Sequence, residues 1–294
     1  MVPRKAYTVP ITGGRRLELG ERTLVMAIVN ITPDSFAERS PSTDPVRALD
    51  LAQAAAAQGA DLLDLGAEST RPGAEVVPAD EEIRRLVPAL RAITARIGLP
   101  VSVDTRKAAV ARVALDEGAS LVNDISGLRY DSGLGAVVAG AGAGLVLMHM
   151  RGTPGGMYRE AVYADVAGEV VRELGEALER ASAAGVSREA VVLDPGIGFA
   201  KRAEHSYEAL ARLSALAVLD RPLLVGTSRK SFLQTALGEC PPASRDWGTA
   251  ASVAAAILEG AHIVRVHAVG EMVQVARVAD EIRRMASAGS DSDF

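Results

Sequence analysis

Polar residues that could carry out chemistry recur along this 294-residue chain, each at or just after a short apolar run. The first lies in Val25–Phe36, where five apolar residues lead to Asn30 and then to a loop that contains Pro33. A buried strand that ends in a polar loop is how parallel α/β proteins build a site. One such loop could also be a capped strand-to-helix turn, but its recurrence favours a shared site. The later residues in equivalent places are Glu68, Thr70, Arg71, Asp104, Asn123, His149, Asp194, Ser228, Arg229, Lys230, Arg265 and His267.

Two kinds of chemistry are present in this set. Two aspartates, two asparagines, a lysine and an arginine together suit a flat, hydrogen-bonding heterocycle, because a carboxylate accepts two parallel N–H bonds from an amino-pyrimidinone edge. Arg71, Arg265 and His267, beside Ser69, Thr70 and Gly73, are a basic group suited to phosphate or pyrophosphate. Asn30 could then give an oxygen to Mg²⁺, which keeps substrate phosphates in its shell. Taken singly, Asp104 and Asp194 could be helix caps and Lys230 a solvated loop charge.

The apolar runs that precede these residues alternate with helical patterns. The expected strands are 25–29, 62–65, 101–103, 120–122, 145–148, 191–193, 223–225 and 263–266. The expected helices are 46–58, 79–97 with a kink at Pro88, 107–117, 131–141, 162–184, 204–216, 246–259 and 269–285. Eight strand–helix units in one alternation predict a (β/α)₈ TIM barrel, whose site lies at the C-terminal ends of the strands. An open doubly wound sheet remains an alternative, but it would usually have fewer strands or a second domain.

The sequence predicts one domain over residues 1–294. A short β-hairpin around Thr12-Gly13-Gly14 is expected to precede the barrel, which should span about 24–286, and 287–294 should form a disordered tail. A formal net charge of −5 argues against a general nucleic-acid or acidic-membrane surface. The single cysteine, Cys240, and the absence of a secretory signal favour a soluble cytoplasmic protein. The four histidines are scattered, which gives no zinc pattern.

Eight motifs, in order, resemble the dihydropteroate synthase family. They are NITPDSF (30–36), AESTRPGAE (67–75), SVDTRK (102–107), NDISG (123–127), LMHMRGTP (147–154), LDPGIGF (193–199), GTSRKSF (226–232) and RVHAV (265–269). The resemblance implies a homodimeric barrel enzyme of folate synthesis, a transferase inhibited by sulfonamides. It would join p-aminobenzoate to 6-hydroxymethyl-7,8-dihydropterin diphosphate and release pyrophosphate, with Mg²⁺ as cofactor.

The resemblance also implies roles for individual residues. The pterin would be held by Asp104, Asn123, Asp194, Lys230 and Arg265, of which all but Asn123 are expected to be catalytic. The diphosphate would be contacted by Asn30, Thr70, Arg71, Arg265 and His267, with Asn30 also binding the metal. The p-aminobenzoate side would be formed by Pro33, Phe36, Arg71, Phe199 and Ser231.

Three departures from the family pattern stand outside the expected pterin ligands. The first loop continues as Ala37-Glu38-Arg39-Ser40-Pro41 instead of a Ser-Asp-Gly-Gly type sequence, Ala200 takes the place of a glycine, and Ala268 that of an aspartate. Two alternatives therefore stay open. One is the pterin-binding barrel of a corrinoid-dependent methyltransferase, which should not need STRPG or SRKSF. The other is a non-catalytic paralogue that binds pterin without turnover, for which the changed first loop is the best support.

Overall fold

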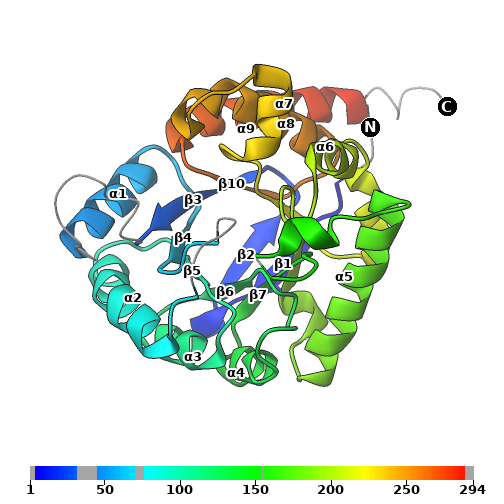
Figure 1. Cartoon of the computed structure of the whole chain (residues 1–294). Helices are drawn as coiled ribbons and strands as arrows, with labels where there is room; N and C mark the ends of the chain where they lie inside the picture. Colours follow the sequence, from blue (N-terminus) through cyan, green and yellow to red (C-terminus); the bar gives the residue numbers. More distant parts are fainter. Residues whose placement is uncertain (1–3, 32–44, 71–75, 154, 289–294) are drawn as a thin grey trace.

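The structure, a computed structural model, describes residues 4–31, 45–70, 76–153 and 155–288. Within these ranges eight parallel strands form one sheet with helices around it (Figure 1), as the alternation predicts. The strands are β3 (Leu24–Asn30), β4 (Leu62–Gly66), β5 (Val101–Asp104), β6 (Leu121–Asp124), β7 (Gly144–Met148), β8 (Val191–Asp194), β9 (Leu224–Val225) and β10 (Ile263–Val266). The helices are α1 (Pro45–Ala57), α2 (Ala79–Thr94), α3 (Ala108–Asp116), α4 (Leu134–Ala141), α5 (Val166–Ala183), α6 (Ala203–Ala211), α7 (Gln234–Leu237), α8 (Asp246–Leu258) and α9 (Val269–Ala288).

The sheet closes on itself to make the barrel. Its order is β8-β7-β6-β5-β4-β3-β10-β9, and a parallel bridge between Leu193 and Leu223 joins the two ends. The Leu193 amide also donates to the carbonyl oxygen of Pro222 at 2.9 Å. The predicted (β/α)₈ barrel is therefore confirmed, and the open sheet is excluded.

The predicted hairpin is also present, and it covers the N-terminal end of the barrel. Strand β1 (Tyr7–Pro10) pairs antiparallel with β2 (Arg16–Leu19). The hairpin side chains Val9, Ile11, Leu17 and Leu19 pack in one buried cluster with the first interior residues of the barrel strands, among them Met26. Burying this apolar end stabilises the barrel by roughly 25 cal/mol per Å² removed from water.

In four of the strands the side chains that face the barrel interior change from apolar to polar. The polar residue comes two positions after the apolar one. Because side chains alternate across a strand, Leu62, Leu121, Val192 and Ile263 share a face with Asp64, Asn123, Asp194 and Arg265. The first set belongs to the apolar cluster at the hairpin end, and the second set lies nearer the C-terminal ends of the strands. The outward-facing residues pack against the helices, as Leu63 and Leu65 do with Leu86 and Leu90 of α2.

Several element boundaries differ from those expected. Helix α2 continues past Pro88, and α6 stops at Ala211, where a 3₁₀ helix (Leu213–Leu219) takes over. Helix α9 runs through Ala288, two residues into the predicted tail, and 289–294 lie outside the described residues.

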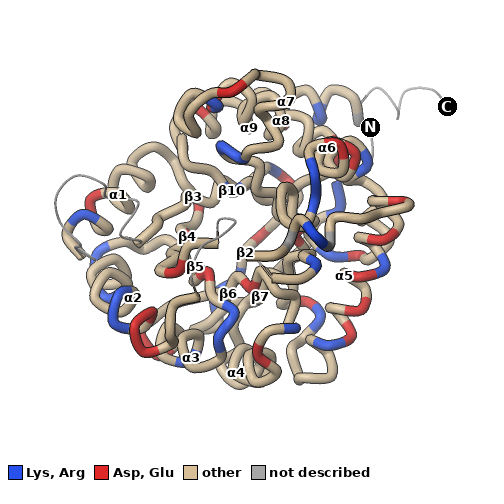
Figure 2. Tube along the Cα trace, in the orientation of Figure 1, with Lys and Arg blue, Asp and Glu red and all other residues tan. Residues whose placement is uncertain are grey.

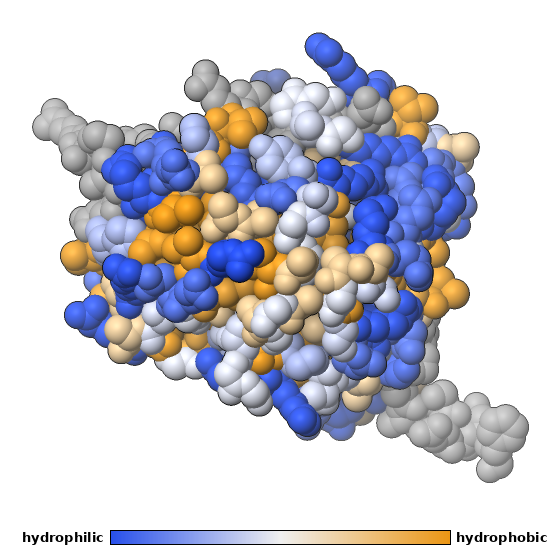
Figure 3. Space-filling view, turned by 90° about the horizontal axis from the view of Figure 1, so that it is seen from below, coloured by the Kyte–Doolittle hydropathy of each residue, from blue (hydrophilic) through white to orange (hydrophobic). Residues whose placement is uncertain are grey.

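In the described part of the chain no helix is long and apolar enough to cross a membrane. Charges of both signs are interspersed around the ring of helices (Figure 2). In the view from below, hydrophobic residues lie between hydrophilic ones (Figure 3).

Candidate active site

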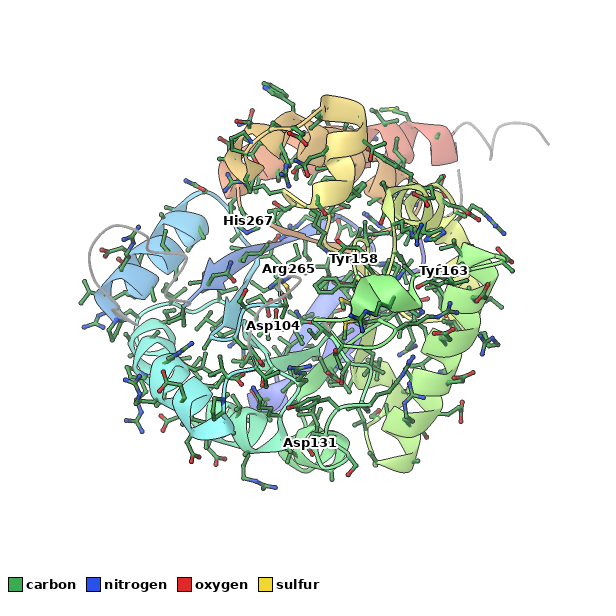
Figure 4. The ribbon with its side chains drawn as sticks, in the orientation of Figure 1. Asp104, Asp131, Tyr158, Tyr163, Arg265 and His267 are labelled. Carbon is green, nitrogen blue, oxygen red and sulfur yellow. The ribbon has the colours of Figure 1, made fainter. Side chains whose placement is uncertain are left out.

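Arg265 of β10 connects two carboxylates at the centre of the barrel mouth. Its Nε donates to Asp64 Oδ2 at 2.6 Å, and its Nη2 donates to Asp104 Oδ2 at 3.1 Å. Figure 4 shows Asp104 and Arg265 together at the open centre of the ring. Asp104 comes from the end of β5 and Asp64 from the middle of β4. The structure thus brings two predicted site residues into direct contact and adds a third, Asp64, that was not among them.

Asn123 of β6 lies beside Asp104 in the strand register and is buried. Its Nδ2 donates to Asp64 Oδ2 at 3.2 Å. Its Oδ1 is buried and has no hydrogen-bond partner among the described residues. An unpaired buried amide oxygen costs free energy, so this atom is suited to accept a bond from a ligand.

Asp194 and Lys230 lie at the ends of β8 and after β9, and the loop that follows β8 joins their surroundings. Asp194 Oδ1 accepts the Gly196 amide at 2.7 Å. Lys230 Nζ donates to the Ile197 carbonyl oxygen at 2.5 Å and lies 4.5 Å from the centre of the Phe199 ring. The predicted pterin residue Lys230 and the predicted p-aminobenzoate residue Phe199 are therefore neighbours.

Burial shifts the pKa of Asp104, Asp194 and Lys230. It raises the pKa of Asp104 to about 7, an effect that Arg265 opposes and the Asp64 charge reinforces. Burial also raises the pKa of Asp194, while the Lys230 ammonium opposes the rise. The same burial lowers the pKa of Lys230 to about 8, against the attraction of Asp194. Perturbed carboxylates and a perturbed amine in one mouth are typical of a functional site.

The predicted metal and diphosphate residues lie on the β3–β4 side of this mouth. Asn30 pairs with Gly66 in the strand register, and a Cβ built on Gly66 would lie 3.7 Å from Asn30 Oδ1 and 3.9 Å from Asp104 Oδ2. Because glycine has no Cβ, no side chain at position 66 lies in contact with these two oxygens. Thr70 and Asp104 line a cavity of about 150 Å³ at the same side. Arg71, Pro33 and Phe36 lie outside the described residues.

The remaining predicted residues are placed less centrally. His267 is exposed after β10, further from Asp104 in Figure 4 than Arg265 is, and its Nδ1 lies 2.9 Å from Ser228 Oγ. Ser231 is exposed at the start of a short 3₁₀ helix (Ser231–Leu233) that directly follows Lys230. Arg229 is turned to Asp246 of α8, with which it forms a two-point ion pair.

His149 directly follows β7, but its side chain is buried and is bonded to residues other than the predicted pterin ligands. Its Nε2 is 3.0 Å from Glu173 of α5 and its Nδ1 is 2.8 Å from Lys201 Nζ. The Glu173 carboxylate can only accept, so Nε2 carries the proton given to it and Nδ1 of the neutral ring accepts from Lys201. Burial lowers the pKa of His149 to about 3, assisted by the Lys201 charge, which agrees with a neutral ring.

Two features of the site were not predicted from the sequence. One is Asp64. The other is an ion-pair cluster that joins Glu68 to residues not expected near it: Lys107 Nζ lies 2.8 Å from Glu68 and 2.5 Å from Glu82. Glu68 also accepts the Val77 amide at 3.1 Å. It therefore ties together the two described ends of the loop between β4 and α2. A charged residue inside an apolar run was the available signal for Asp64, since LLDLG is otherwise apolar.

Comparison with known proteins agrees with this geometry. Residues 26–267 match the family model described as pterin binding enzyme. A dihydropteroate synthase of Synechocystis sp. is 43% identical over 279 residues, covering 95% of this chain and 96% of that protein. That of Escherichia coli K12 is 42% identical, covering 87% and 90%.

Solved structures give the same result. The dihydropteroate synthase of Yersinia pestis with a sulfonamide drug superposes with a TM-score of 0.88 at 40% identity, covering 93% of this chain and 98% of that one. The enzyme of Xanthomonas albilineans in complex with 7,8-dihydropteroate has a TM-score of 0.80 at 34% identity, with the same two shares covered.

Proposed function

The chain belongs to the dihydropteroate synthase family of pterin-binding enzymes, and from this membership we propose how its barrel mouth acts. The reaction is the condensation of 6-hydroxymethyl-7,8-dihydropterin diphosphate with p-aminobenzoate, which gives 7,8-dihydropteroate and pyrophosphate. The observation that carries the assignment of the site is the group of Asp104, Asp194, Asn123 and Arg265 around one mouth, with burial perturbing both carboxylates.

The pterin lies flat in this mouth. Asp194 and Asp104 accept N–H bonds from its edges, Asn123 Oδ1 accepts one more, and Lys230 donates to its carbonyl oxygen. Arg265 stacks on the ring. The support is chemical: Asp194 and Asn123, which are buried, and Asp104, whose side chain is 11% exposed, are acceptors that match a ring rich in N–H groups, and Lys230 matches its carbonyl.

The diphosphate and Mg²⁺ lie on the Asn30 side. Asn30 Oδ1 would give Mg²⁺ one neutral protein oxygen, with no side chain from Gly66 against it, and the ion would take its other ligands from phosphate and water. No cluster of three or more His, Cys, Asp or Glu residues that could hold a metal occurs in the described ranges, which suits a metal held mainly by its substrate. When bound, Mg²⁺ supplies positive charge next to the leaving phosphate oxygens. Thr70, Arg71, Arg265 and His267 contact the same group.

The chain's own residues contribute orientation and electrostatics. Loss of pyrophosphate leaves positive charge on the pterin methylene and ring, and the carboxylates of Asp104 and Asp194 stabilise that charge. Arg265 is held by Asp64 and Asp104, so its guanidinium does not need to reorganise as the charge develops. The arylamine then attacks the methylene carbon and loses a proton. No side chain forms a covalent intermediate.

The p-aminobenzoate site is formed by Phe199 and Ser231 together with Pro33, Phe36 and Arg71. The proximity of Lys230 to the Phe199 ring supports a second pocket next to the pterin. Because the Yersinia pestis relative was solved with a sulfonamide drug, sulfonamides are proposed to occupy this pocket as inhibitors. The single cysteine, Cys240, supports the proposed cytoplasmic location.

A homodimer is proposed to form through α7, α8 and α9. These helices lie side by side at the top of Figure 1. Val278, Ile282 and Met285 are exposed at helical spacing along α9, and Trp247 at the start of α8 is 87% exposed. Sedimentation of the protein and of an Ile282→Glu variant tests this: the parent should sediment as a dimer and the variant as a monomer.

Pyrophosphate release with each substrate alone and with both tests the function. Release that needs both substrates is expected. A methyltransferase barrel would release none, and a non-catalytic paralogue would bind the pterin in calorimetry without release. The relatives that match most of this chain are dihydropteroate synthases, so the comparisons favour neither alternative.

A further inference from the structure

We infer that Asp64 is a positioning residue that fixes which atom Asn123 presents to the pterin and holds the plane of Arg265. The inference rests on the proposed function, because it takes Asn123 and Arg265 as pterin ligands. Asp64 is fully buried in the middle of β4, one interior layer below Asp104.

The argument begins with the hydrogen-bonding capacity of a carboxylate. Asp64 forms an ion pair with Arg265, so its oxygens are acceptors only. The atom of Asn123 that lies 3.2 Å from Asp64 Oδ2 must therefore be the donor Nδ2. The two orientations of an amide side chain are otherwise close in energy, since they have the same shape. Asp64 removes this degeneracy.

The consequence is that Asn123 offers an acceptor to the mouth. Its Oδ1 has no partner among the described residues, while Nδ2 is already bonded. A ligand amino group would donate a hydrogen bond to this oxygen. A ligand carbonyl at the same place would put a second acceptor against it, and the two oxygens would repel. Asp64 thereby selects an amino-substituted pterin over a ring with oxygen at that carbon.

Asp64 acts on Arg265 through the same oxygen. Arg265 Nε donates to Asp64 at 2.6 Å and Nη2 donates to Asp104 at 3.1 Å, so the guanidinium is fixed at two of its nitrogens. Two fixed points define the plane that stacks on the pterin.

The other oxygen of Asp64 argues against a purely structural role. Asp64 Oδ1 and Oγ of Ser102, its register partner on β5, are both buried without a hydrogen-bond partner in the described part of the chain. A buried carboxylate that satisfies one oxygen and leaves the other unpaired is a poor way to stabilise a barrel, and an apolar residue of similar size would often serve as well. Its value lies in the contacts to Asn123 and Arg265.

Three variants separate positioning from structure. Asp64→Leu keeps the branched shape, with methyl groups in place of the oxygens, and removes the acceptor, so Asn123 becomes free to turn. Asp64→Asn keeps an acceptor oxygen for Arg265 and Asn123. Ser102→Ala is the matched control, because it changes a buried polar residue in the same layer that makes no hydrogen bond.

The measurement is calorimetric affinity for two rings without diphosphate, pterin and its 2-oxo analogue lumazine. The parent should prefer pterin. Asp64→Leu should reduce that preference by roughly tenfold to a hundredfold, the effect of an unmatched buried hydrogen-bonding group. Asp64→Asn and Ser102→Ala should retain the preference. If circular dichroism shows that Asp64→Leu does not fold, Asp64→Ala takes its place in the same comparison.

Two results overturn the inference. One is a folded Asp64→Leu or Asp64→Ala variant that weakens both rings equally, and the other is loss of the preference in Asp64→Asn. Failure of the proposed function has a different signature. If Asn123→Ala binds pterin as tightly as the parent does, the pterin pocket itself is misassigned, whatever the Asp64 variants do.

Discussion

Asp194→Asn should abolish turnover while leaving the folded protein at least as stable as the parent. The reason is the bond between Asp194 Oδ1 and the Gly196 amide, at 2.7 Å. The asparagine must keep its oxygen at this N–H, because its own Nδ2 would face another donor there. Nδ2 is then forced to the position of Oδ2, where the pterin edge also presents donors.

The size of the effect follows from this geometry. A hydrogen bond to a charged group, worth about 1.5–3 kcal/mol, becomes an unpaired buried donor, which costs about 1–3 kcal/mol more. The sum, about 3–6 kcal/mol, weakens pterin binding by roughly 10²- to 10⁴-fold. The free energy of unfolding should not fall. Burial raises the pKa of Asp194, which means that the folded parent holds this charge at a cost, and asparagine does not incur that cost.

Calorimetry with a non-reactive pterin and urea unfolding measure the two quantities. Asp124→Asn is the matched control, since Asp124 is also a buried strand-end carboxylate but accepts the amides of Ser126 and Leu128 with its two oxygens. It should lose stability and keep pterin affinity. Near-parental affinity in Asp194→Asn would refute the assignment of Asp194 as a pterin acceptor.

Three further outcomes are expected. Burial raises the pKa of Asp104 to about 7, so pterin affinity, measured by calorimetry, should rise from about pH 6 to about pH 8 as the carboxylate ionises. The folded state holds this proton more tightly than the unfolded state, so the urea stability of the ligand-free protein should fall from about pH 4 to about pH 7. Excess EDTA should stop pyrophosphate release, and an unchanged rate would remove Asn30 from the mechanism. Ala200 is buried with φ +48°, so Ala200→Gly relieves about 1 kcal/mol of left-handed strain. Two effects oppose this gain. The variant loses a buried methyl group, which costs about 0.8 kcal/mol, and glycine gives the unfolded chain more conformational freedom, which also lowers the stability. Its urea stability should therefore change by less than about 1 kcal/mol, whereas the β-branched Ala200→Val should lose more than about 2 kcal/mol.

The sequence predicted the members of the mouth because parallel strands end at one rim. Asp104, Asn123, Asp194 and Arg265 each occupy the last interior position of a strand, so a list of strand ends found them without any three-dimensional information. The barrel itself followed from the alternation of elements. Element types were predictable for the same reason, since strand and helix periods differ strongly.

The residues that support the mouth were not predictable in this way. Asp64 lies inside a strand, and its partners are on β6 and β10, so its role depends on which strands become neighbours across the interior. The Glu68–Lys107–Glu82 cluster joins residues from the β4–α2 connection, the β5–α3 connection and helix α2. His149 follows a strand, as site residues do, but its ring is turned toward Glu173. Strand position alone does not say which way a side chain points after the strand has ended.

The loop after β8 connects the proposed pterin pocket with the proposed p-aminobenzoate pocket. Lys201 Nζ donates to the carbonyl oxygens of Gly196 at 3.2 Å and Phe199 at 3.3 Å, while Lys230 Nζ donates to that of Ile197. A pterin that accepts a hydrogen bond from Lys230 Nζ would compete with the Ile197 carbonyl oxygen for this donor. The loop would then be held by the bonds from Lys201. Because Lys201 is fully buried and also bonded to His149, it is in a position to keep Phe199 in place while Lys230 turns to the substrate. In the proposed site, Lys201 holds the loop while Lys230 binds the pterin, so that one loop can contribute to both substrate pockets.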